Sequence, residues 1–113
     1  MTTEYKFRTM ADVRAINRAI GHHWFERSTM RFFNSQVESG LYGGHYFVTS
    51  ERMDLDRPKR YSIRVVKNDG TIDTYGDFQL FTNLQAARNS AKALARSDDW
   101  QERLELRDLY TDA

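Results

Sequence analysis

The amino-acid sequence predicts an α+β fold: an antiparallel sheet of three to five strands, with an N-terminal helix and a C-terminal helix packed on one face. Residues 60–67 alternate apolar and polar side chains, which is typical of a strand with one face in a core. An Asn-Asp-Gly turn at 68–70 leads into a second strand-like run, and residues 82–96 carry apolar side chains at helical spacing. The 113 residues fit one compact domain over 1–113, with an expected radius of gyration of about 13 Å.

The first helix is expected over residues 10–20. Thr9 can cap its N-terminus, Asp12 lies at the third helical position as in a capping box, and Gly21 provides a stop. One face of this helix carries the apolar residues Met10, Val13, Ile16 and Ile20.

Strand patterns dominate the middle of the chain. A turn at 41–44 precedes a strand at 45–50, and the strand at 60–67 is followed by another at 71–75. In the strand at 60–67, Tyr61, Ile63 and Val65 share one face, and Arg60, Ser62 and Arg64 share the other. Residues 29–33 are compatible with a strand or with a helical turn that Ser28 begins.

The last helix is expected to start at Thr82, with Gln85 closing a capping box, and to run to about residue 96. Its inward face would hold Leu84, Ala87, Ala91 and Leu94. After it, Asp99 and Glu102 would suit another helix, whereas residues 104–107 alternate with period two. We favour a strand there.

Composition narrows the class of protein. The absence of cysteine excludes disulfides and thiolate zinc sites and fits a reducing cytoplasm. No apolar run reaches the ~20 residues that span a bilayer, and the N-terminus lacks the apolar core of a secretory signal. We therefore expect a cytoplasmic protein that does not contact a membrane.

No catalytic motif is recognisable. His22 and His23 are adjacent, so their side chains diverge on regular structure, and with His45 they form no metal-ligand spacing. Gly40, Gly43 and Gly44 lack the Lys-Ser/Thr that follows a phosphate loop. The sequence predicts no enzyme, no metal and no cofactor, with a His-dependent nuclease as the least favoured alternative.

A basic cluster is the best candidate binding surface. If neighbouring strands pair, its arginines lie on one sheet face beside an aromatic ring, an arrangement that holds single-stranded nucleic acid. The alternative is a solvated face balanced by Asp54, Asp56 and Asp73. The candidate residues are Arg52, Arg57, Lys59, Arg60, Arg64 and Tyr75.

Four aromatic side chains lie within ten residues: Trp24, Phe25, Phe32 and Phe33. Most of them should fill the core between helix and sheet. An exposed member would instead indicate a protein-binding surface, where aromatic residues and arginine are enriched.

Several segments carry a resemblance to a known group: 24–25, 28–33, 46–51, 57–61 and 70–74 with 78–79. Over residues 15–94 the chain resembles a group of small bacteriophage-encoded proteins of unknown function. The resemblance implies a phage origin and expression in a bacterial host cytoplasm, and it brings no catalytic residues.

These observations favour a non-catalytic accessory binding protein that acts on a host or phage protein. A weak nucleic-acid-binding domain that uses the basic sheet face is the second prediction. An exposed edge strand could also pair two copies of the chain into a homodimer.

Overall fold

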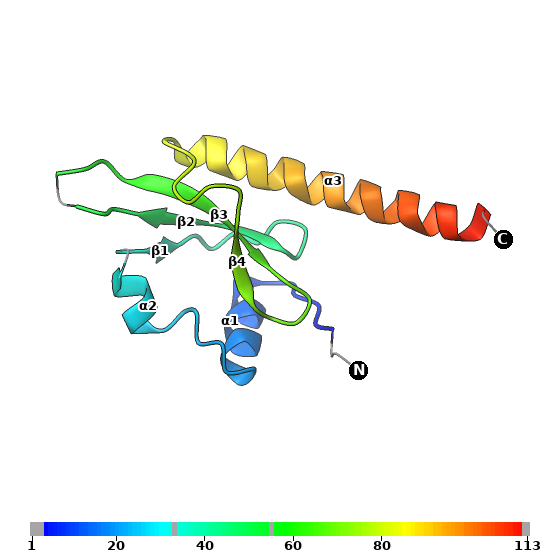
Figure 1. Cartoon of the computed structure of the whole chain (residues 1–113), viewed down its shortest axis with the longest axis horizontal. Coiled ribbons are helices and arrows are strands. Elements are labelled where there is room, and N and C mark those ends of the chain that lie inside the picture. The colour runs from blue at the N-terminus through cyan, green and yellow to red at the C-terminus, as the bar shows by residue number, and fades with distance from the viewer. Residues whose placement is uncertain (1–3, 33, 55, 112–113) are drawn as a thin grey trace.

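The structure is a computed structural model that describes residues 4–32, 34–54 and 56–111, with side chains as far as residue 97. Its elements, in chain order, are α1 (Met10–Ala19), α2 (Arg27–Phe32), β1 (Gln36–Val37), β2 (Tyr46–Glu51), β3 (Arg60–Val66), β4 (Ile72–Tyr75) and α3 (Leu84–Thr111) (Figure 1). The predicted α+β class is confirmed.

The four strands form one antiparallel sheet in the order β1-β2-β3-β4. The turn predicted at 68–70 joins β3 to β4, with Val66 opposite Ile72 in the register. Gly70 takes a φ of 92°, a left-handed value that favours glycine, and its amide donates to the carbonyl of Lys67. The hairpin therefore closes where the sequence predicts it.

Helices cover both faces of the sheet (Figure 1). On one face Phe47 and Val66 pack with Met10 and Val13 of α1. On the other face Val48 and Ile63 pack against α3. The sheet is therefore the middle of three layers, with α1 on one face and α3 packed on the other.

The predicted N-terminal helix and its cap are confirmed, but the helix ends at Ala19, and Ile20 is an exposed C-cap rather than part of the buried face. Thr9 accepts a hydrogen bond from the amide of Asp12, whose carboxylate accepts from the amide of Thr9, so the capping box is complete. Residues 27–32 form the helical turn α2 rather than a strand. The two-residue strand β1 was not predicted.

The start of α3 corrects the predicted cap. Asn83, not Thr82, accepts hydrogen bonds from the amides of Gln85 and Ala86. The side-chain oxygen of Asn83 therefore caps the helix, in place of the Thr82 hydroxyl that the capping pattern predicted. The predicted inward residues are right, since Ala87 and Ala91 are fully buried and Leu84 and Leu94 pack against them.

The predicted strand at 104–107 is wrong, because α3 continues to Thr111. Alternation over four residues is weak evidence for a strand. A helix that has already formed gains one backbone hydrogen bond for each residue added, so it extends through this segment. The second half of α3 runs past the sheet (Figure 1) and raises the radius of gyration to 15.7 Å. Within the described residues, none of the helices combines the length and the apolar character needed to cross a bilayer.

Candidate functional site

Arg64 is not part of an exposed basic surface, so its predicted position is wrong. It lies opposite Phe47 on β2, on the face that α1 covers, and only 7% of its surface is exposed. Its guanidinium lies 5.3 Å from the ring of Trp24 and 5.2 Å from the ring of Phe78. The alternation of side chains along the strand predicted the correct face of β3 for Arg64. That face is buried rather than exposed to solvent.

The charge of Arg64 is balanced by Glu51, which is completely buried. Their side chains form an ion pair at 2.8 Å. The carboxylate of Glu51 also accepts from the hydroxyls of Thr49 (2.6 Å) and Ser62 (3.1 Å). Arg64 donates in addition to Thr49 and to Thr74. Among the described residues, every buried side-chain nitrogen and oxygen has a hydrogen-bond partner, so this polar network is compatible with a stable core.

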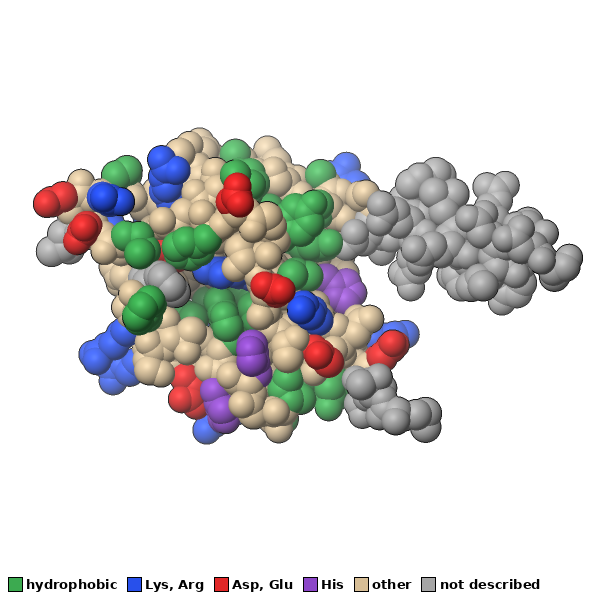
Figure 2. Space-filling view, viewed as in Figure 1, with side chains coloured by type: hydrophobic (Ala, Val, Ile, Leu, Met, Phe, Trp, Pro, Cys, Tyr) green, Lys and Arg blue, Asp and Glu red, His purple; other side chains and the backbone are tan. Residues whose placement is uncertain are grey.

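Tyr75 and Lys59 are not part of the predicted basic surface either. Tyr75 lies opposite Ile63, on the α3 face, and its ring meets that of Tyr46 edge-on at 6.1 Å. Lys59 donates to the side-chain oxygen of Gln36 on β1. Over the face seen in Figure 2, Lys and Arg side chains are interspersed with Asp and Glu. The predicted six residues therefore do not form one basic sheet face.

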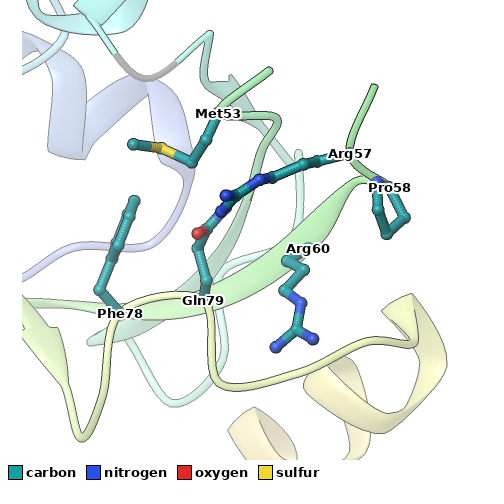
Figure 3. Close-up of a pocket in the computed structure, with 6 residues that line it drawn as sticks. All are labelled: Met53, Arg57, Pro58, Arg60, Phe78 and Gln79. Carbon is teal, nitrogen blue, oxygen red and sulfur yellow. The ribbon is translucent and has the colours of Figure 1, made fainter. Parts of the chain in front are cut away.

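Arg57 and Arg60 do come together, at a cleft of about 310 Å³. Figure 3 shows the Arg57 side chain reaching across toward Gln79, with Met53 and Phe78 beside it. Met53 is 47% exposed and Phe78 38% exposed. The cleft is lined by Met53, Arg57, Pro58, Arg60, Phe78 and Gln79. Arg52 is exposed, but it does not line the cleft.

The buried network fixes the wall of the cleft that follows β4. Gln79 has a φ of 59°, which is uncommon for a residue with a side chain. Its amide donates to Ser62 (2.8 Å) and its side chain donates to the backbone carbonyl of Glu51 (3.4 Å). Strained backbone of this kind persists only where surrounding contacts hold it and is enriched at functional sites.

The cleft combines positive charge with exposed apolar surface. Within the described part of the chain, no carboxylate lines it, and neither Arg57 nor Arg60 forms an ion pair. Arginine binds carboxylates in a planar, two-point geometry, and methionine adapts its shape to irregular apolar partners. The lining of this cleft is chemically complementary to an acidic and partly apolar group.

The histidines are engaged in local contacts. His22 accepts from the side chain of Asn17 at 2.8 Å, His23 pairs with Glu26 at 2.9 Å, and His45 contacts the carbonyl of Val66 at 3.0 Å. Among the described residues, no group of three His, Cys, Asp or Glu side chains could hold a metal ion.

The aromatic cluster divides between core and surface. Trp24 and Phe25 each lie 5.9 Å from Phe47 and pack onto the core. Phe32 is 78% exposed. An exposed aromatic side chain in this cluster is the feature expected of a protein-binding surface. Phe33 lies outside the described residues.

Sequence reasoning missed Met53, Phe78 and Gln79, which come from loops without a periodic pattern. It also missed the buried network. The available signal was the alternation of polar residues in two neighbouring strands, Thr49 and Glu51 in one and Ser62 and Arg64 in the next. Polar side chains at matched positions of paired strands indicate a shared polar cluster.

Comparisons with curated proteins and with solved structures find no match. A family model matches residues 9–92, which include α1, the whole sheet and the start of α3, and therefore the cleft and the buried network. The chain belongs to this family, which is described as a family of unknown function (DUF7447).

Proposed function

We propose that the protein is a non-catalytic accessory binding protein whose cleft takes an acidic, partly apolar segment of a partner protein. One observation carries the proposal: Arg57 and Arg60 line the cleft together with the exposed side chains of Met53 and Phe78. Arginine and aromatic residues are the anchor types that dominate protein interfaces.

The charge of the cleft selects the partner. Its two guanidinium groups have no carboxylate partner among the described residues, so an incoming Asp or Glu side chain can supply one. The apolar part of the partner would cover Met53 and Phe78 and exclude water from the new ion pairs, which strengthens them. The exposed Phe32 supports a protein-binding role in general.

A bacteriophage origin is part of the proposal, as is action on a host or phage protein in the bacterial cytoplasm. Its support is the resemblance of residues 15–94 to small phage-encoded proteins.

Affinity purification from bacterial lysate tests the proposal. We compare the wild type with the variant R57E/R60E and with the control R8E/R96E, whose two arginines are exposed and lie outside the cleft. The wild type and the control are expected to retain the same protein, and R57E/R60E is expected to lose it. Retention of nucleic acid with no protein above background would overturn the proposal.

Weak nucleic-acid binding is the second candidate, because Arg52, Arg57, Lys59 and Arg60 are close in sequence and largely exposed. With Arg64 buried, four phosphate contacts give a log–log salt slope of about −3 at most on single strands. A single-stranded DNA column at low salt separates the candidates, since the protein-binding proposal expects no retention.

A His-dependent nuclease stays the least favoured prediction. It requires that the triple variant H22A/H23A/H45A lose DNA or RNA cleavage that the wild type performs. The absence of any turnover by the wild type would remove it.

A further inference from the structure

A second pocket of about 340 Å³ lies between α1 and the start of α2, away from the cleft. Arg14 and Arg18 come from α1, and Arg27 is the first residue of α2. The remaining lining residues are Asn17, His23, Phe25 and Glu26. Three guanidinium groups from two helices thus line one concave site.

The positive charge of this pocket is not balanced within the protein. None of the three arginines pairs with a carboxylate in the described part of the chain. Glu26, the carboxylate in the lining, is already paired with His23 at 2.9 Å. Arg14 and Arg18 are four residues apart on one helix, a spacing at which like charges repel. A bound anion would relieve this repulsion.

The pocket is also held rigidly. Asn17 is completely buried at its base and donates to the carbonyl of Gly70 (2.9 Å), and its oxygen accepts from the amide of Trp24 (2.8 Å). His23 has a φ of 54°, one of three positive values at residues other than glycine among those described. Strain at a residue that lines a pocket is compatible with a preformed site.

We propose that this pocket binds a phosphate monoester or a similar doubly charged phosphoryl group. Planar guanidinium groups match the oxygens of phosphate in two-point geometry, and a dianion balances three cations better than a singly charged phosphodiester does. Arg14 lies over the ring of Phe25 at 4.9 Å, so that ring face is not available to stack on a nucleobase. These features favour a terminal phosphate over a nucleic-acid strand. The proposal is independent of the cleft and of its partner.

Isothermal titration with inorganic phosphate and with pyrophosphate, at constant ionic strength, tests it. The wild type is expected to bind both anions, and the variant R14Q/R18Q is expected to lose at least tenfold in affinity. The control R96Q removes an exposed arginine on the opposite layer and should bind like the wild type. Amide chemical-shift changes in the wild type should concentrate at residues 14–27.

The outcomes are separable. If R14Q/R18Q does not fold, R27Q provides the same test outside α1 and should also lose affinity. The proposal is overturned if the wild type binds neither anion, or if R14Q/R18Q and R27Q bind as well as the control. It is also overturned if only a single-stranded oligonucleotide binds and R14Q/R18Q abolishes that binding, because this result assigns the pocket to nucleic acid.

Discussion

The buried ion pair between Glu51 and Arg64 gives a sharp prediction about stability. The substitution E51L would leave the guanidinium of Arg64 buried with no opposite charge, and R64M would do the same to the carboxylate of Glu51. Removing one partner of a buried pair costs about 3–5 kcal/mol. Each single variant should therefore lose a large part of the total stability, which for a domain of this kind is about 5–15 kcal/mol.

The double variant E51L/R64M should lose much less than the two single variants together, because it leaves no unpaired charge. What remains is the loss of hydrogen bonds at the hydroxyls of Thr49, Ser62 and Thr74, at about 1 kcal/mol each. We expect a loss of about 2–4 kcal/mol for the double variant and therefore a coupling free energy of at least about 2 kcal/mol.

Urea unfolding followed by far-UV circular dichroism measures all three free energies. The exposed pair of Lys67 and Asp73, at 3.3 Å, serves as the control and should give nearly additive effects. A coupling below about 1 kcal/mol between Glu51 and Arg64 would refute the reasoning, because it would mean that neither charge depends on the other in the core.

Three further predictions concern other parts of the fold. N17A should destabilise the protein by about 2–4 kcal/mol in urea unfolding, since it leaves the amide of Trp24 and the carbonyl of Gly70 without their partner. G43A should lower the thermal midpoint, because Gly43 has a φ of 60° and a Cβ there would lie 2.6 Å from the Cβ of Ala95; overpacking costs about 1–3 kcal/mol. The backbone amide of Arg8 lowers the pKa of Asp12, and the hydroxyl of Thr71 lowers the pKa of Asp69, both below the ordinary 3.8. The stability from these two carboxylates is therefore present above pH 3.8 and lost as the pH falls through their lower folded-state pKa values. Acid titration of D12N/D69N should show a shallower loss in that range.

Each of these three predictions has a contrary result. An N17A variant with wild-type stability would mean that water replaces the amide. A G43A variant with an unchanged midpoint would mean that α3 shifts freely against the turn at residue 43. An unchanged acid titration in D12N/D69N would mean that the two hydrogen-bonded carboxylates do not contribute to the pH dependence.

Local signals explain which parts of the fold were predictable. The capping box at Thr9 and the Asn-Asp-Gly turn at 68–70 each act within a few residues, so one sequence is enough to locate them. The strand β1 has two residues and exists because Gln36 and Val37 meet Ser50 and Thr49 on β2. A contact of this kind depends on the tertiary fold, so no pattern in residues 36–37 predicts it.

The candidate site was predictable only in part, for a related reason. Arg57 and Arg60 are found from local charge, whereas their apolar companions Met53 and Phe78 come from separate loops. Arg64 was misplaced because a polar residue opposite an apolar strand face normally points to solvent. Here helices cover both faces, and the partner that makes burial of Arg64 tolerable, Glu51, lies thirteen residues away on the neighbouring strand.

The buried network and the cleft are physically connected, and this affects how binding data should be interpreted. Phe78 lies over Arg64, and the amide of Gln79 is held by Ser62, which in turn donates to Glu51. A substitution in the network therefore changes the shape of the cleft without touching a partner. Loss of binding in R64M would report a displaced cleft wall, whereas loss in R57E/R60E with normal stability would report a lost contact. Only the second result supports recognition of an acidic partner by the cleft itself.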